Sequence, residues 1–316
     1  MHFRPFPKIS THRVLPPQPM GGPWVALEKL HGAQLVIASD GGTIHVGKRK
    51  AWLKTDEPFF GWQLIISELV PGVQAIARQA AAKQTVVYGE LVGGRYPHPD
   101  VPAIPGLAPV QTGIWYTPAL IWIAFDVLVA ANDEDEGELL AYSELESLAE
   151  NAGVRTPPCL LRGTRAALEH VNVRFPTRVP TWFGLPQLPD NFAEGIVLKP
   201  DVRCAPSKRP ILKRKLPEFD DDRFGEAEAW NPGRLSEDAL MTWVDRMIQP
   251  ARLASARSKV GIDPAAIVDE VALDVTVDLG LAFRDAWDRL SEASQEKILA
   301  HARALATQRL IAGAGQ

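Results

Sequence analysis

The chain has 316 residues, of which 46% are hydrophobic and 23% are charged, and its formal net charge is −4. This length is enough for one large domain or two ordinary ones, and the composition is that of a soluble globular protein. The negative balance argues against a protein that coats nucleic acid by bulk attraction. Its two cysteines, Cys159 and Cys204, have neither the number nor the spacing of a disulfide framework or a structural zinc site.

The sequence contains no apolar run of the length that a transmembrane helix needs, and its first residues lack the apolar core of a signal peptide. We therefore expect a cytoplasmic protein that does not enter a membrane.

In chain order, the first strong signal is a lysine between two β-prone runs. Residues 24–27 lead into Lys29 and residues 34–38 lead away from it, and the glycines at 41–42 predict a hairpin turn after the second run. Gly32 allows the backbone to turn directly after the lysine. Lys29 is either a surface lysine in a hairpin or an amine whose burial serves a chemical purpose, because burial disfavours its charged form.

The next stretch alternates helices and strands, with long proline-rich loops at 95–109 and 176–189. Periodicity predicts one kinked helix or two successive helices over 62–82, interrupted at Pro71. Short helices are expected at 142–152 and 165–171, and strands at 85–92, 119–130, 192–200 and 211–216.

After residue 222 the pattern becomes helical throughout. Ser236 predicts a helix N-terminus, Gly261 closes the following helix, and Asp263 with Pro264 begins another. We expect an N-terminal domain over 1–222 and an all-helical C-terminal domain of four or five helices over 223–316.

Several charged residues occupy strand positions that should be apolar, which implies a shared polar cleft. Lys213 and Lys215 alternate along one strand and therefore share a face. Glu194 and Lys199 are five positions apart, so they face opposite sides unless a bulge or a strand end intervenes. The complete set is Lys29, Glu90, Asp126, Glu194, Lys199, Lys213 and Lys215.

Taken together, these segments resemble the covalent nucleotidyltransferase superfamily of ATP-dependent ligases and capping enzymes, and most closely its "RNA ligase 2" type. The motifs are Glu-Lys-Leu-His-Gly, Tyr-Gly-Glu-Leu, Ala-Phe-Asp-Val, Glu-Gly-Ile-Val-Leu-Lys-Pro and Leu-Lys-Arg-Lys, in that order along the chain. The resemblance implies an α+β fold with a mainly antiparallel, ATP-grasp-like nucleotidyltransferase domain before the helical domain.

The resemblance also implies the chemistry and the role of each residue. Lys29 would attack the α-phosphate of ATP, AMP would pass to a 5′-phosphate, and a 3′-hydroxyl would then expel AMP, with Mg²⁺ or Mn²⁺ as the metal. A free lysine amine, with a pKa near 10.4, is neutral in only about one molecule in a thousand, so like charges and the metal must disfavour its proton. The catalytic set is Lys29, His31, Lys213 and Lys215, and the cofactor-binding set is Glu28, Arg49, Glu90, Phe125, Glu194 and Lys199.

Several assignments have explicit alternatives. Asp126 is expected at the metal beside Glu194, or else in an ion pair with a lysine. Phe125 stacks on adenine or belongs to the core, and Arg49 contacts the ribose or is a solvated charge. Arg95 and His98 in the long loop grip nucleic acid or are merely solvated.

The leading functional prediction is a monomeric ATP-dependent RNA ligase that seals 3′-OH and 5′-phosphate ends, at nicks in duplex RNA or RNA/DNA. A DNA ligase or a capping guanylyltransferase normally has an OB domain where this chain reads as helical. The alternative from another class is a catalytically idle nucleotide- or RNA-binding protein on the same fold.

Overall fold

The computed structural model describes residues 1–11, 21–219 and 235–313. The chain forms two compact units. The first comprises Met1–Leu53, Gly72–Ala103 and Pro109–Glu228, and the second comprises Lys54–Pro71, Ile104–Ala108 and Ala229–Gln316. The predicted domain boundary at residue 222 lies outside the described residues. The second unit also contains two short segments that the sequence analysis placed in the first domain.

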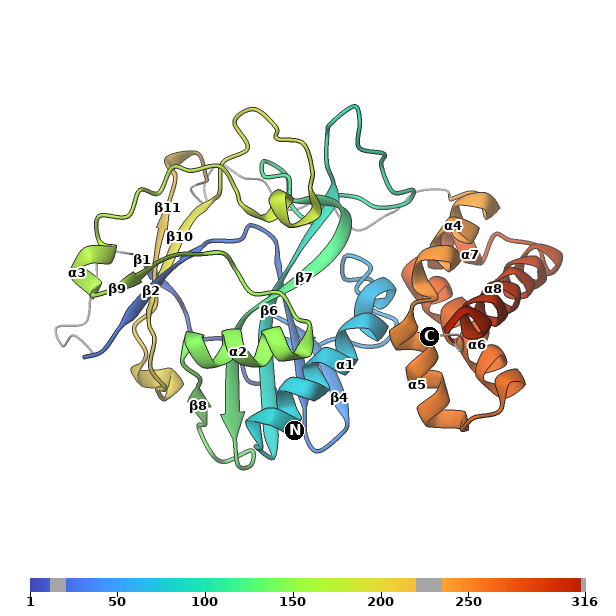
Figure 1. The fold of residues 1–316 in the computed structure, drawn as a ribbon, viewed down its shortest axis with the longest axis horizontal. Helices are drawn as coiled ribbons and strands as arrows, with labels where there is room; N and C mark the ends of the chain where they lie inside the picture. The colour runs from blue at the N-terminus through green and yellow to red at the C-terminus, as the bar shows by residue number, and fades with distance from the viewer. Residues whose placement is uncertain (12–20, 220–234, 314–316) are drawn as a thin grey trace. The chain divides into compact units, whose positions relative to one another are not determined.

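The first unit is built on two sheets (Figure 1). The six-stranded sheet is antiparallel at every pairing, because short turns connect most of its neighbouring strands. Its order is β5 (Ala51–Trp52), β4 (Ile44–Lys48), β3 (Ala33–Ser39), β6 (Gln84–Arg95), β7 (Thr117–Ala130) and β8 (Glu138–Leu139).

The five-stranded sheet carries the lysine motif. It is antiparallel except for the pairing of its first strand, β1, with β11. Its order is β1 (Ser10–Thr11), β11 (Leu212–Lys215), β10 (Gly195–Pro200), β2 (Trp24–Glu28) and β9 (Cys159–Gly163).

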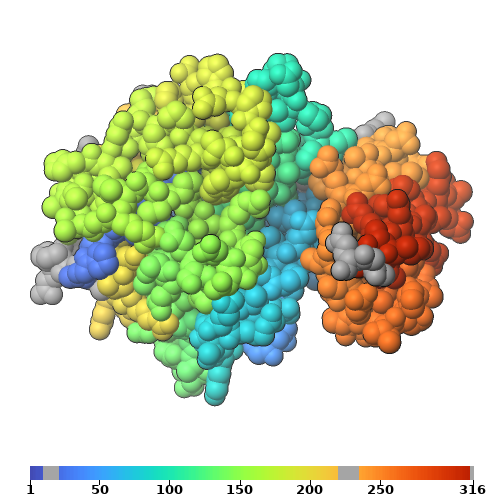
Figure 2. Space-filling model, viewed as in Figure 1, coloured from blue at the N-terminus to red at the C-terminus, as the bar shows by residue number. Residues whose placement is uncertain are grey.

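Two longer helices accompany these sheets. The region around Pro71 forms one continuous helix, α1 (Gln63–Ala80), which settles the choice between one helix and two. The second half of α1 lies beside α2 (Tyr142–Ala152), as Figures 1 and 2 show. A Cβ on Gly72 would lie 2.6 Å from Val154 Cγ2, so glycine permits this close approach. The short helices of this unit are α3 (Arg165–Leu168), η1 (Val179–Phe183), η2 (Pro206–Lys208) and η3 (Pro217–Phe219).

The C-terminal part of the second unit is helical, as predicted. Ser236 and Asp263 cap helices by accepting hydrogen bonds from Ala239 N and Ala266 N, and Gly261 ends the helix between them. The helices of residues 235–313 are α4 (Glu237–Met247), α5 (Pro250–Val260), α6 (Pro264–Ala282), α7 (Arg284–Trp287) and α8 (Glu292–Gly313). Within the described residues, none of the helices combines the length and the apolar character needed to cross a membrane.

The predicted fold class, α+β with antiparallel sheets and a helical C-terminal region, is confirmed. The sequence analysis missed the short strands β1, β5, β8 and β9, and it ended β6 at Val92, whereas this strand continues to Arg95.

Candidate active site

Lys29 directly follows β2, a strand whose five residues are all buried. Its backbone N–H donates to the carbonyl oxygen of Gly195, at a distance of 2.9 Å, so the lysine is fixed against the start of β10. Its amine lies 2.6 Å from Glu194 Oε2. The lysine side chain is 18% exposed, which leaves the amine within reach of a ligand.

Glu194 is the centre of the cluster around Lys29. Its Oε1 lies 2.8 Å from the amine of Lys215, and its Oε2 lies 3.5 Å from His31 Nδ1. Burial raises the pKa of this carboxyl, but Lys29, His31 and Lys215 outweigh burial and lower the pKa to about 2. Glu194 is therefore ionised at neutral pH, and its carboxylate contacts the amines of both Lys29 and Lys215.

The strand register explains why Lys213 and Lys215 share a face. In the antiparallel pair of β10 and β11, Lys213 lies opposite Val197 and Lys215 opposite Gly195. Glu194 precedes the first residue of β10 and is thus at a strand end, the arrangement that the sequence analysis required for it to reach the ligand.

Gly195 sets the position of Glu194. Its φ is +148°, and a Cβ there would lie 2.0 Å from Arg214 O. We expect Gly195→Ala to lower the free energy of unfolding by at least about 2 kcal/mol and to impair the chemistry of the cluster, because the backbone must shift. Gly163→Ala is the matched control, since its Cβ would have Ala167 Cβ at 3.8 Å as its nearest neighbour. Equal denaturation midpoints for the two variants would contradict this account.

Glu90 lies on β6, close to the lysine motif. Its Oε1 accepts a hydrogen bond from Gly32 N, at 3.1 Å. Burial raises its pKa to about 7; the positive charge of Lys29 opposes this rise and the negative charge of Glu194 adds to it. Arg49, exposed in the turn between β4 and β5, also stabilises the charged form of Glu90. The shared ribose role of Glu90 and Arg49 stays a prediction.

Glu28 holds a loop. Its side chain is 1% exposed, and its two carboxylate oxygens accept hydrogen bonds from Thr177 Oγ1 at 2.5 Å and Arg178 N at 3.0 Å. The carboxylate is thus engaged with residues 177–178, and its predicted cofactor contact stays untested. Burial raises the pKa of Glu28 to about 7, although these two hydrogen bonds oppose the rise.

This raised pKa predicts a pH-dependent stability. A carboxyl whose pKa rises from 4.5 to about 7 on folding stabilises the protein fully below pH 4.5, and the stabilisation is lost as the pH passes 7. Relative to Glu28→Gln, which does not titrate, wild-type protein should lose about 3 kcal/mol of unfolding free energy across this window. Urea denaturation at several pH values measures the difference. A difference in unfolding free energy between the wild-type protein and Glu28→Gln that is constant with pH would refute the prediction.

Asp126 and Lys199 form a buried ion pair that joins the two sheets. Lys199 Nζ lies 2.8 Å from Asp126 Oδ2, and Arg209 Nη1 lies 2.8 Å from Asp126 Oδ1. Burial lowers the pKa of Lys199 to about 8, with Asp126 opposing and Arg209 reinforcing the effect. Because Lys199 and Arg209 are only 2% and 0% exposed and each contacts one oxygen of Asp126, the structure favours the ion-pair alternative for this residue over a metal ligand. Lys199 therefore pairs with Asp126, whereas Lys29 pairs with Glu194.

Phe125 is half-buried on β7 and packs against Phe6, with the ring centroids 5.1 Å apart. It therefore borders the core and keeps part of its ring accessible, so both of its alternatives remain.

The sequence analysis missed the residues that hold His31. The backbone N–H of His31 donates to the hydroxyl of Tyr116 at 2.9 Å, and its ring packs on Phe219 with centroids 5.5 Å apart. Tyr116 is 87 positions after Lys29 and Phe219 comes after the last lysine motif, so no local pattern could connect them with His31.

Arg95 is the last residue of β6, and His98 lies in the long loop that follows. Arg95 is exposed, and its guanidinium lies 5.8 Å from the ring centroid of Trp115. His98 Nδ1 accepts a hydrogen bond from Asp100 N. Neither contact distinguishes a nucleic-acid grip from a solvated loop.

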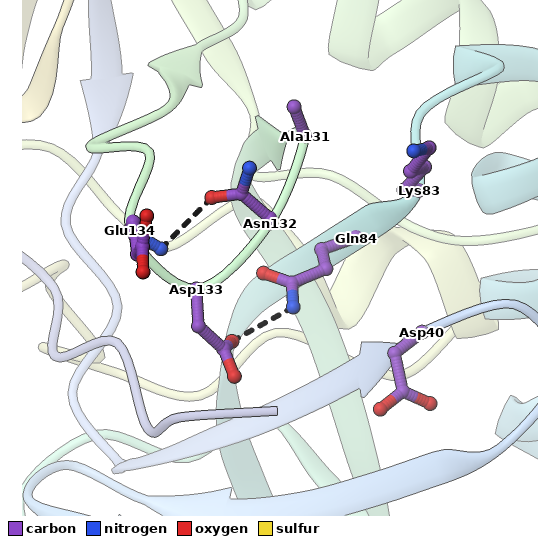
Figure 3. Close-up of a pocket in the computed structure, with 7 residues that line it drawn as sticks. All are labelled: Asp40, Lys83, Gln84, Ala131, Asn132, Asp133 and Glu134. Carbon is purple, nitrogen blue, oxygen red and sulfur yellow. Dashed lines mark hydrogen bonds between the residues drawn. The ribbon is translucent and has the colours of Figure 1, made fainter.

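A surface hollow of about 610 Å³ lies elsewhere in this unit. Figure 3 shows its lining side chains, with a hydrogen bond from Gln84 to Asp133. No candidate residue lines it, so the hollow adds nothing to the lysine cluster. Its lining residues are Asp40, Lys83, Gln84, Ala131, Asn132, Asp133 and Glu134.

Comparison with known proteins decides the family. The family described as RNA ligase matches residues 22–215. The chain belongs to the RNA ligase family. The matched span includes Lys29, Glu194 and Lys215, together with every other candidate residue, whereas helices α4 to α8 lie outside it.

Two RNA-editing ligases of Trypanosoma brucei brucei are similar in sequence. Mitochondrial RNA-editing ligase 2 is 32% identical over 200 residues, which cover 56% of this chain and 48% of that protein. Mitochondrial RNA-editing ligase 1 is 29% identical over 284 residues, which cover 78% of this chain and 59% of that protein. The chain thus spans about half the length of the relatives it matches.

Among solved structures, the RNA ligase of Naegleria gruberi with PPi superimposes with a TM-score of 0.40 at 16% identity, covering 62% of this chain and 50% of that chain. A variant of the same ligase with AMP and Mn gives a TM-score of 0.42 at 15% identity, covering 62% and 50%.

Proposed function

We propose that this RNA ligase family member is an ATP-dependent RNA ligase that joins 3′-OH and 5′-phosphate ends. The observation that carries the proposal is the Lys29 amine, 2.6 Å from buried Glu194 at a family-matched position. An idle binding protein has no need to keep an accessible lysine in an ionised cluster with a second lysine and a histidine.

The first step follows from nucleophilic catalysis at phosphorus. Lys29 Nζ forms a bond to the α-phosphorus of ATP, the bond to the bridging oxygen breaks, and pyrophosphate leaves with that electron pair. The amine proton passes to solvent. Lys215, and Lys213 on the same face, would offset the negative charge that builds up on the phosphates.

Two further steps return Lys29 to its free form. An oxygen of the RNA 5′-phosphate attacks the α-phosphorus and takes AMP from the lysine. The 3′-hydroxyl oxygen then attacks the 5′-phosphorus, AMP leaves, and the hydroxyl proton passes to solvent. Lys29 bonds to AMP only before the transfer to RNA, so the last step does not need its amine.

The donor set of the cluster fits a hard divalent cation such as Mg²⁺ or Mn²⁺. No group of three or more metal-ligating side chains gathers in the described residues, so Glu194 would hold the cation together with phosphate oxygens and water. The cation would supply positive charge beside the α-phosphate. With Glu194 so engaged, its charge would no longer stabilise the ammonium form of Lys29, and Lys215 would repel the amine proton.

We further propose that the substrate is a nick in duplex RNA or RNA/DNA, that the protein acts as a monomer, and that it is cytoplasmic. The two similar Trypanosoma ligases are named as mitochondrial, so fractionation of the source cells would test the compartment. Sealing assays on nicked duplexes that differ only in the sugar at the 3′-OH, with unannealed strands as the control, would test the substrate. Equal sealing of annealed and unannealed strands would contradict the nick proposal.

Arg95 offers a separate test of nucleic-acid binding. If its exposed guanidinium grips the substrate backbone, Arg95→Ala should label Lys29 with AMP normally and raise the RNA concentration at half-maximal sealing by about three- to tenfold. Raised salt should reduce the difference, because phosphate contacts are screened. Unchanged sealing by Arg95→Ala would refute a contact of Arg95 with the RNA backbone.

A further inference from the structure

The N-terminal segment, residues 1–7, is fixed on the six-stranded sheet by Arg4. Its guanidinium donates to the carbonyl oxygens of Asp135 and Asn132, each at 2.6 Å, and to Gln84 Oε1 at 3.2 Å. The carbonyl oxygen of Arg4 accepts a hydrogen bond from Tyr88 Oη at 3.0 Å. These bonds join the segment to β6 and to the β7–β8 connection, so the side chains after Arg4 have defined places on the sheet.

Phe6 is the residue of this segment that reaches Phe125. The two ring centroids are 5.1 Å apart and the planes meet at 81°, an edge-to-face geometry. Phe6 also packs on Tyr88, with centroids 5.1 Å apart. Edge-to-face pairs favour one relative orientation, because the positive edge of one ring meets the negative face of the other.

Phe125 lies at an irregularity in the pairing of β6 with β7. In the pairing of β6 with β7, Tyr88 lies opposite Asp126 and Gly89 opposite Ala124, so Phe125 is the extra residue of a β-bulge. Lys199 Nζ donates to its carbonyl oxygen at 2.7 Å. Lys199 therefore holds the backbone of Phe125, and Phe6 holds its ring.

We infer that Phe6 is a positioning residue for the adenine base, acting through the ring of Phe125. The inference rests on the proposed function and takes the alternative of the sequence analysis in which Phe125 stacks on adenine. Phe6 fixes the ring plane that the base meets. Its ring packs on Phe125 and Tyr88, so it acts on the base end of ATP and leaves the phosphate end unaffected.

Equilibrium binding tests this inference with two probes, in the presence of magnesium. The first probe is an ATP analogue with a methylene bridge between its α- and β-phosphates, which cannot release pyrophosphate, and the second is inorganic tripolyphosphate, which has no base. We expect Phe6→Leu to weaken binding of the analogue by about two- to tenfold and to leave tripolyphosphate binding unchanged. Phe6→Tyr, which keeps the ring, should bind both probes as the wild-type protein does.

Phe3→Leu is the matched control, because Phe3 lies on the same segment and packs edge-on against Trp52 with centroids 5.0 Å apart. It should bind both probes normally. In a Phe125→Leu background, Phe6→Leu should have no additional effect, since it acts through the missing ring.

The inference would be overturned if the wild-type protein did not bind the analogue, or if Phe6→Leu bound it with unchanged affinity. It would also be overturned if Phe3→Leu lost as much affinity for the analogue as Phe6→Leu, or if Phe6→Leu lost as much affinity for tripolyphosphate as for the analogue. Failure of the proposed ligase function shows separately, as absence of covalent AMP after incubation of wild-type protein with ATP and magnesium.

Discussion

Replacement of Lys29 by arginine is expected to lower ATP-dependent sealing by at least about a thousandfold. Arginine keeps the positive charge and can keep an ion pair with Glu194, but its guanidinium is protonated at all ordinary pH values and is not a nucleophile. Gel assays of strand joining with ATP measure the loss. Because the charge is retained, a loss of activity cannot be assigned to the electrostatics of the cluster.

The control for this variant is a substrate whose 5′-phosphate already carries AMP. Since the last step does not use the lysine amine, Lys29→Arg should seal this strand within about tenfold of the wild-type rate. Equal loss on both substrates would contradict a purely covalent role, and retained ATP-dependent sealing would remove Lys29 as the nucleophile.

The largest expected effect on stability comes from Asp126. Replacement by asparagine leaves Lys199 and Arg209, which are 2% and 0% exposed, without their carboxylate. Removing one partner of a buried ion pair costs roughly 3–5 kcal/mol. We expect a loss of this size in the free energy of unfolding at pH 7, measured by chemical denaturation.

Two comparisons sharpen this prediction. Asp100→Asn removes an acid that is 86% exposed, and it should change stability by less than about 1 kcal/mol. Asp126 raises the pKa of Lys199, which is about 8 in the wild-type protein, so Lys199 should shed its proton at lower pH in Asp126→Asn, and the loss should shrink as the pH rises towards 8. A loss under 1 kcal/mol at pH 7 would show that the pair contributes little.

Local patterns predicted most of the elements. The caps at Ser236 and Asp263 mark helix starts that the structure reproduces, and the alternation of Lys213 and Lys215 matches their register in β11. Caps and alternation depend on neighbouring residues, so one sequence suffices to find them. The strand β9 was missed because it is a short edge strand with exposed positions, where no hydrophobic pattern marks it.

The contacts within the site could be predicted only in part. Motif order grouped Lys29, Glu194 and Lys215, and the structure brings these three together. An ion pair of Asp126 with a lysine was among the predictions, but Thr177 as a partner of Glu28 and Arg209 as a partner of Asp126 could not be predicted. Both residues are remote in sequence from the acids and lie in loops whose course depends on the whole fold. Arg209 lies between η2 and β11, and its side chain is buried.

The central claim is that Lys29 forms a covalent bond to AMP. Its most direct test is mass spectrometry of wild-type protein after incubation with ATP and magnesium, first intact and then as peptides. We predict one AMP adduct per chain, attached to Lys29, that is absent in Lys29→Arg. An adduct on another residue, or none under conditions in which the protein is folded and binds ATP, would contradict the claim.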